Sequence, residues 1–157
     1  MLGGLASAIA KGRSDVAWDE LGLMLAERLR ERIDGEAPKA PSLSPAARRR
    51  VVQAALWLDE HAHEAVELAD VAKAVASSPF HLLRQFSRVF GVTPHQYLIR
   101  CRLRRAAVLL ADDEASVTDV AYAVGFGDLS NFVRTFGRAA GVSPSRFAAL
   151  PRAQRKF

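Results

Sequence analysis

Four arginines form two pairs with the same spacing, and their side chains suit the binding of phosphates or nucleobases. Arg84 and Arg88 are four residues apart, as are Arg134 and Arg138. Residues four apart lie on one face of a helix. A guanidinium group offers parallel N–H donors that can bind a phosphate, or the O6 and N7 atoms of guanine. The pairs therefore predict two cationic helix faces of a kind that fits the DNA major groove.

These arginine pairs belong to a segment that the chain contains twice. Residues 71–94 read VAKAVASSPFHLLRQFSRVFGVTP, and residues 120–144 read VAYAVGFGDLSNFVRTFGRAAGVSP. The first halves of the copies align at an offset of 49 residues and the second halves at an offset of 50. A short turn tolerates a one-residue insertion, whereas a helix interior does not. Each copy is therefore predicted to form a helix, a turn and a second helix.

The second helix of each copy has an apolar face and a mixed face. The apolar face is predicted to be core and consists of Leu82, Phe86, Val89 and Phe90 in the first copy, and of Phe132, Phe136 and Ala140 in the second. The opposite stripe is Phe80, His81, Leu83, Arg84, Ser87 and Arg88, then Leu129, Ser130, Val133, Arg134, Gly137 and Arg138. A solvated charged face is the alternative interpretation. Duplication favours DNA, because two such helices on one chain can read successive major-groove segments roughly 34 Å apart.

The pattern is helical from Pro45 onward, so we expect an all-α fold with no sheet. A helix following Ser44 as its cap should turn Val52, Ala55 and Leu56 inward, together with either Leu58 or Asp59. The first helix-turn-helix is expected at about 68–90, a long connecting helix at about 94–110, and the second helix-turn-helix at about 117–140. Ser78 and Asp128 are expected to cap the second helices. Gly125 is expected to serve a turn, and Phe126 to lie in the core.

The N-terminal part differs in character. Residues 15–34 repeat apolar side chains at helical spacing, and residues 37–44 are rich in Pro and Ser, which predicts a linker. We place a boundary there: 1–44 is an N-terminal helix and linker, 45–150 the main domain, and 151–157 a basic tail. We hypothesise weak homodimerisation through residues 15–34.

Charge is distributed unevenly. The chain has 22 basic and 17 acidic residues, and residues 1–40 contain 6 basic and 7 acidic ones. The remainder therefore holds 16 basic and 10 acidic residues. Between Pro79 and Ala111 there are six arginines and no acidic residue. Such a cationic stretch is typical of a surface that binds phosphates.

Other function classes find little support. The single cysteine, Cys101, cannot form an internal disulfide, and His61 and His63 lack a cysteine with which to complete a zinc site. No apolar run approaches the roughly 20 residues of a membrane span, and the first residues lack the basic region of a signal peptide. We expect a cytoplasmic protein with no metal and no cofactor.

These motifs together resemble the DNA-binding domain of the AraC/XylS family of bacterial transcription activators. The resemblance covers about residues 46–150 and rests on SPFHLLRQF, GVTPHQYLIRCRLRRAAVLL and VTDVAYAVGFGDLSNFVRTFGRAAGVSP, with Phe147 following soon after. It implies a sequence-specific regulator, an activator, that binds double-stranded DNA and is not an enzyme. RNA polymerase is an expected partner. Most members of the family have a separate sensing or dimerisation domain ahead of this one, so the resemblance implies two alternatives for the N-terminal helix. The chain is either a short member that acts as a monomer, or residues 1–40 are the last helix of a sensing or dimerisation domain.

The resemblance also assigns roles to residues. It implies base reading by Phe80, His81, Leu83, Arg84 and Ser87 in the first copy, and by Leu129, Ser130, Val133 and Arg134 in the second. Phosphate contacts are expected from Ser78, Arg88 and Arg138. The family often has a basic residue where this chain has Ser87 and Gly137, and polar readers where it has Leu83 and Val133. Fewer hydrogen bonds to bases are therefore expected.

Arg102, Cys101 and the arginine faces each have an alternative interpretation. Arg102 matches a recurrent arginine of the connecting helix and is expected to be a buried tether, with DNA contact as the alternative. Cys101 could accept alkyl groups from DNA, but it lacks a Pro-Cys-His context and is expected to pack inside the protein. The arginine faces could instead bind an acidic protein, and a steep salt dependence of DNA binding would exclude that reading.

Overall fold

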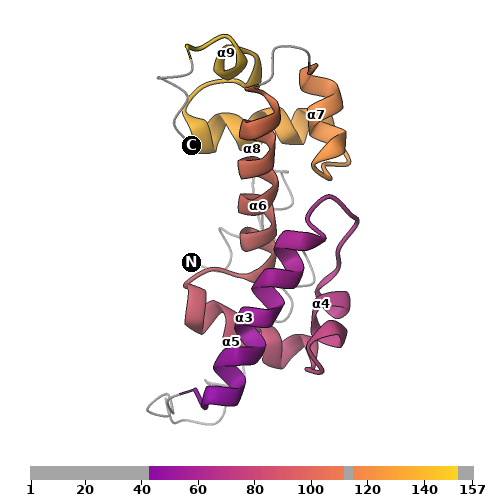
Figure 1. The fold of residues 1–157 in the computed structure, drawn as a ribbon, viewed down its shortest axis with the longest axis vertical. Helices are drawn as coiled ribbons and strands as arrows, with labels where there is room; N and C mark the ends of the chain where they lie inside the picture. Colours follow the sequence, from indigo (N-terminus) through magenta and orange to yellow (C-terminus); the bar gives the residue numbers. More distant parts are fainter. Residues whose placement is uncertain (1–42, 112–114, 152–157) are drawn as a thin grey trace, which may run out of the picture. The chain divides into compact units, whose positions relative to one another are not determined.

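A computed structural model describes residues 43–111 and 115–151, and in these ranges the chain forms helices and no strand. The helices are α3 (Pro45–Glu60), α4 (Leu68–Ala74), α5 (Pro79–Phe90), α6 (Pro94–Leu109), α7 (Val117–Ala123), α8 (Leu129–Ala140) and α9 (Pro144–Ala148) (Figure 1). The predicted all-α class with paired helix-turn-helix motifs is confirmed. The predicted helix at 15–34 and the end of the basic tail lie outside the described residues.

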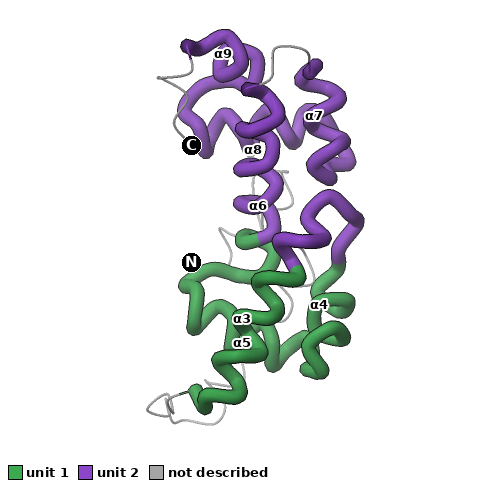
Figure 2. The backbone as a smooth tube through the Cα atoms, viewed as in Figure 1, with its two compact units in different colours: residues 1–57, 67–97 green, residues 58–66, 98–157 purple. Residues whose placement is uncertain are grey.

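The chain divides into two compact units (Figure 2). Of the described residues, 43–57 and 67–97 belong to unit 1, and 58–66, 98–111 and 115–151 belong to unit 2. The first helix-turn-helix, α4 and α5, lies in unit 1, and the second, α7 and α8, lies in unit 2. Each repeat of the sequence thus belongs to its own unit, while α3 and α6 contribute residues to both.

In unit 1, α4 packs against α5. The core contains Val71 from α4 and Leu82 and Phe86 from α5, all almost fully buried. The Phe86 ring lies 4.7 Å from that of Phe90 and 5.5 Å from that of Tyr97, measured between centroids. These two residues, Phe86 and Leu82, were predicted to be core, and the structure confirms it.

The buried face of α3 differs from the prediction. Val52 and Leu56 are exposed, with 44% and 66% of their surface accessible. The buried residues recur at steps of three and four and are Ala47, Val51, Ala54, Ala55 and Leu58. Three alanines thus take the inward stripe, because helical periodicity decides which side chains face inward regardless of their size.

In unit 2, α7 and α9 both pack against α8. The core is built largely from phenylalanine. Neighbouring ring centroids lie 5.2 Å apart for Phe126 and Phe132, 5.6 Å for Phe132 and Phe136, and 5.3 Å for Phe136 and Phe147. Leu103 and Leu110 of the α6 segment join this cluster. The two phenylalanines of α8 therefore fix its inward face, and Phe126 is core as predicted.

The turn between the two helices of each motif requires left-handed backbone in both copies. Gly125 has φ +96° and Ala76, at the equivalent position of the first copy, has φ +49°. Only glycine adopts this region without steric cost. The prediction that Gly125 serves the turn is confirmed. No helix of the described residues is long and apolar enough to cross a membrane.

Candidate nucleic-acid interface

Helix α5 carries the first set of predicted DNA contacts. Its start is fixed by Ser78, whose Oγ accepts a hydrogen bond from the backbone N–H of His81 at 3.3 Å, and by Pro79 in the first turn. Ser78, His81, Arg84 and Arg88 are exposed, and Phe80 and Ser87 are partly buried. The predicted cationic face of this helix is therefore on the surface of unit 1.

Leu83 is the exception, and its predicted place on this exposed stripe is wrong. Its side chain is buried, with 5% of its surface accessible. The buried arc of α5 comprises Leu82, Leu83 and Phe86. Leu82 and Leu83 are adjacent, and both are buried, so the apolar face is one position wider than predicted. Burying the second leucine is favourable because it removes apolar surface from water. Leu83 therefore packs in the core of unit 1 and is not on the exposed face of the helix.

Helix α8 carries the second set. The carboxylate of Asp128 caps it by accepting hydrogen bonds from the N–H groups of Ser130 and Asn131, both at 3.0 Å. Ser130, Val133 and Arg134 are exposed, as is Arg138 one turn later. Leu129 is partly buried and packs against the phenylalanine core, and Gly137 is also partly buried. The caps predicted at Ser78 and Asp128 are both present.

The hydrogen bond between Arg134 and Asn131 on α8 was not predicted from the sequence. The Arg134 guanidinium donates a hydrogen bond to Oδ1 of Asn131 at 3.0 Å, and the buried Thr135 hydroxyl donates to the same oxygen at 3.3 Å. Asn131 thus holds Arg134 against the helix. The available signal was the i to i+3 spacing of an amide and an arginine, which places the two side chains side by side.

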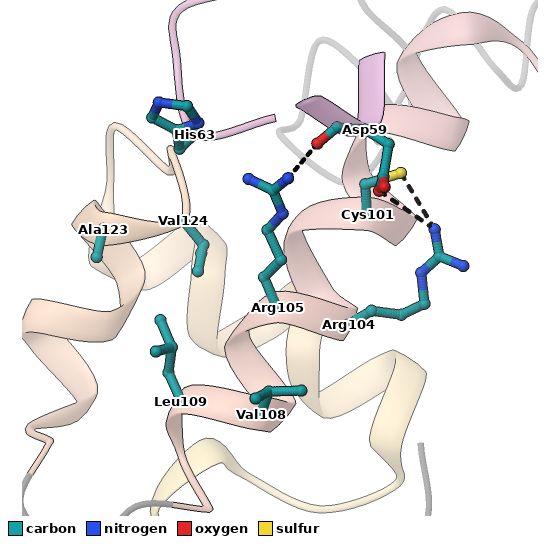
Figure 3. A pocket seen from close by; sticks show the side chains of 9 residues that line it. All are labelled: Asp59, His63, Cys101, Arg104, Arg105, Val108, Leu109, Ala123 and Val124. Atoms are coloured by element: carbon teal, nitrogen blue, oxygen red, sulfur yellow. Dashed lines mark hydrogen bonds and ion pairs between the residues drawn. The ribbon is translucent and has the colours of Figure 1, made fainter. Parts of the chain in front are cut away.

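Cys101 lies in unit 2 in a pocket of about 570 Å³ (Figure 3). The Sγ atom accepts a hydrogen bond from Arg104 at 3.3 Å, and Arg104 also lies 3.7 Å from the Asp59 carboxylate. Arg105 donates to the Asp59 backbone carbonyl. The cysteine is buried, and burial raises the pKa of its thiol. The prediction that Cys101 packs inside the protein is confirmed, and its thiol is protonated at neutral pH.

Arg102 occupies the interior of unit 2. Its Nε donates to the carbonyl of Ala62 and its Nη2 to the carbonyl of Glu64, both at 2.7 Å. The guanidinium carbon lies 5.9 Å from the centroid of the Phe126 ring. Burial lowers the pKa of Arg102. The predicted buried tether is thus present. The described residues contain no cluster of three or more His, Cys, Asp or Glu side chains that could hold a metal ion.

Comparison with protein families identifies this arrangement. A family model described as a helix-turn-helix domain matches residues 71–149, which begin within α4 and extend through α9. The chain belongs to the AraC/XylS family. The match includes both copies of the repeat, the connecting helix and Phe147.

Curated AraC/XylS relatives are similar over the same region. The chain is 43% identical over 88 residues to the transcriptional activator RhaS of Escherichia coli O139:H28, covering 56% of this chain and 32% of RhaS. It is 35% identical over 101 residues to the regulator YdeC of Bacillus subtilis, covering 64% of this chain and 35% of YdeC. The chain therefore spans about a third of the length of these relatives.

Solved structures match the fold. The DNA-binding domain of AdpA, determined in complex with a target DNA, is 31% identical with a TM-score of 0.62, covering 68% of this chain and 96% of that domain. An AraC-type regulator from Chromobacterium violaceum is 27% identical with a TM-score of 0.61, covering 71% and 96% of the respective chains. Both similar proteins are named as regulators of transcription.

Proposed function

We propose that this chain is a sequence-specific transcriptional regulator, an activator, that inserts α5 and α8 into two successive segments of the DNA major groove. The observation that carries the proposal is the exposed, capped α8, on which Arg134 is held by Asn131 beside Ser130 and Val133. A guanidinium held in one orientation can form the bidentate contact that distinguishes guanine. The DNA complex of the similar AdpA domain supports the same ligand.

The contacts divide into two chemical kinds. Arg84 and Arg134, with the neighbouring side chains of His81, Ser87, Ser130 and Val133, are proposed to read bases, and Phe80 and Leu129 to add apolar contact. Ser78, Arg88 and Arg138 are proposed to bind phosphates. Phosphate contacts fix the register of the protein on DNA, whereas contacts with base edges select the sequence.

The wider assignment follows from this role. We propose that residues 45–150 form the DNA-binding domain and that RNA polymerase is a partner of the activator, consistent with the activator RhaS among its relatives. Residues 15–34 are proposed to contribute weak self-association. A protein that binds chromosomal DNA acts in the cytoplasm of a bacterium.

Selection of bound sequences from a random duplex pool tests the proposal directly. We expect a bipartite site whose two elements are centred roughly ten base pairs apart, because each helix needs its own major-groove segment. Affinity should fall steeply with salt, by a log–log slope of about 0.9 per neutralised phosphate. Recovery of no consensus, or tight binding of an acidic protein that DNA does not displace, would contradict the proposal.

Two arginine variants separate base reading from phosphate binding. Arg84→Ala should cost about 1–3 kcal/mol on the selected site and relax the preference at one base pair, because a base contact is lost. Arg88→Ala should weaken binding to all sequences alike, because a phosphate contact carries no sequence information. Equal losses on specific and random DNA for Arg84→Ala would show that Arg84 does not read a base.

A further inference from the structure

Arg102 joins two parts of unit 2 that are distant in the sequence. Its two hydrogen bonds reach the carbonyls of Ala62 and Glu64, about forty residues earlier in the chain. Its guanidinium also lies over the ring of Phe126, which belongs to the turn between α7 and α8. A single side chain therefore holds the segment that follows α3 against the turn that precedes the second proposed reading helix.

The turn at Gly125 leaves room for the contact between Arg102 and Ala62. A Cβ atom at Gly125 would lie 2.8 Å from the Ala62 carbonyl oxygen and 3.0 Å from Nε of Arg102. Real Cβ atoms essentially never come within 3.0 Å of another atom, as this one would of the Ala62 oxygen, so the absence of a side chain permits the contact. The backbone of the turn, the guanidinium and the 62–64 segment meet at one point.

The contact continues into α8 through aromatic rings. The Phe126 ring lies under the guanidinium, and it also meets the fully buried ring of Phe132, at 5.2 Å between centroids in an edge-to-face arrangement. Phe132 lies in the first turn of α8, next to the proposed reader Val133. Close-packed rings transmit displacement, because interiors of this density have little free volume.

Stability alone is a weak reason for a buried guanidinium at this place. Arg102 is 9% exposed, and an apolar side chain of similar volume would avoid the cost of removing a charge from water. What an arginine adds is direction, since its N–H groups form a rigid fork that sets the positions of both carbonyls. Its guanidinium remains protonated at neutral pH even though burial lowers its pKa.

We propose that Arg102 is the positioning residue of the second reading helix. It fixes the 125–128 turn, and thereby the orientation in which α8 presents Ser130, Val133 and Arg134 to a base pair. Arg102 itself contacts no DNA. The inference rests on the proposed function of α8 as a reading helix, and it names the group on which sequence selection by that helix depends.

The test compares Arg102→Met and Arg102→Lys with Arg104→Met in the full chain. Arg104 is the matched control, because it lies on the same helix and carries the same charge but is exposed. Affinities are measured on the selected duplex and on duplexes with single base-pair changes in each element. The element read by α8 is identified as the one at which Arg134→Ala loses discrimination.

We expect Arg102→Met to lose discrimination at the α8 element by at least about fivefold while keeping that of the α5 element within about twofold. Arg102→Lys should be intermediate, because one ammonium cannot reproduce the fork. Arg104→Met should leave discrimination at both elements unchanged. In folded Arg102→Met, equal losses at both elements would mean that the tether does not act on α8 in particular, and unchanged discrimination would mean that the tether is not needed. Either result overturns the proposal.

A measurement without DNA separates this inference from the proposed function. In ¹⁵N-labelled protein, Arg102→Met should shift the amide resonances of Ser130, Asn131 and Arg134, and Arg104→Met should not. If the wild-type chain selects no duplex, the proposed function fails, while these resonances still decide whether Arg102 positions α8. Should Arg102→Met not fold, Arg102→Lys and Phe126→Leu provide the same comparison, and unmoved α8 resonances in both would overturn the inference.

Discussion

Leu83 and Val133 occupy equivalent positions of the two copies, yet one is buried and the other is 38% exposed. The buried arc of α5 is Leu82, Leu83 and Phe86, whereas that of α8 is Phe132, Thr135 and Phe136. The residues available for base contact therefore differ between two helices that look alike in the sequence. We expect the two elements of a DNA site to differ in sequence, because Val133 can contact a base in the α8 element whereas the buried Leu83 cannot do so in the α5 element.

The hydrogen bond from Arg134 to Asn131 is expected to pre-organise Arg134 for contact with one base pair. Asn131→Ala should lower affinity for the selected site by about twofold to tenfold, because Arg134 must then lose side-chain entropy on binding. Titrations of the single and double variants form a double-mutant cycle. Asn131→Ala should have little further effect in an Arg134→Ala background, and full additivity of the two changes would contradict the pre-organising role.

Cys101 provides a prediction about reactivity. Because burial raises the pKa of its thiol and the side chain is 1% exposed, iodoacetamide should alkylate the folded chain much more slowly than free cysteine at pH 8. The rate should rise at a higher pH than for free cysteine, and unfolding in urea should remove the difference. Mass spectrometry follows the modification. Rapid alkylation of the folded chain near pH 7 would instead support the alkyl-accepting alternative.

At the scale of elements, the two motifs meet the same backbone requirement with different residues. The turn of the second motif uses Gly125, and that of the first uses Ala76 in a left-handed conformation that costs an L-residue about 1–2 kcal/mol. Ala76→Gly should therefore stabilise the chain by about 1 kcal/mol, measured by urea unfolding with circular dichroism. Ala74→Gly, in the last turn of α4, is the control and should destabilise by about 0.5–1 kcal/mol. A loss of stability in both variants would contradict the strain at Ala76.

The converse substitution in the second motif should be costly. Gly125→Ala would place a Cβ atom 2.8 Å from the Ala62 oxygen at φ +96°, which combines a clash with backbone strain. We expect a loss of about 3 kcal/mol. Gly127→Ala is the matched control, since no atom lies within 4 Å of a Cβ atom there, and it should change stability by less than about 0.5 kcal/mol. Similar unfolding curves for both variants would show that the turn tolerates a side chain.

The sequence predicted those features of the helices that depend on residues close together in the chain. Duplication and spacing predicted the helices, and the caps at Ser78 and Asp128 followed from residue type, because a cap is satisfied within one turn. Leu83, Val52 and Leu56 were misplaced because burial depends on which packing partners lie nearby, and these come from distant parts of the chain. The burial of Arg102 was predicted. Its partners, the carbonyls of Ala62 and Glu64, could not be predicted because they lie about forty residues away in the chain.

At the scale of the whole molecule, the sequence places the two cationic helices on one polypeptide, so that both elements of a site can be bound by one chain. Binding the second element is then an intramolecular step, and the combined affinity exceeds that of either element alone. The stoichiometry should be one chain per bipartite site, which sedimentation of the complex measures. The opposite result would be two chains bound per site, with one chain still bound when either element is deleted. It would mean that a second copy of the chain binds the second element.

This argument predicts a strict dependence on DNA phase. Inserting five base pairs between the elements turns one of them by about half a helical turn, so that its major groove faces away from the chain that holds the other. Affinity should fall to that of the better single element, a loss of at least about tenfold, whereas changing five base pairs of the spacer without insertion should have a much smaller effect. Titration of the three duplexes by fluorescence anisotropy measures the difference. Because each element remains intact in the inserted duplex, only the connection between the two helices can account for the loss. An unchanged affinity after insertion would therefore mean that α5 and α8 do not read DNA together.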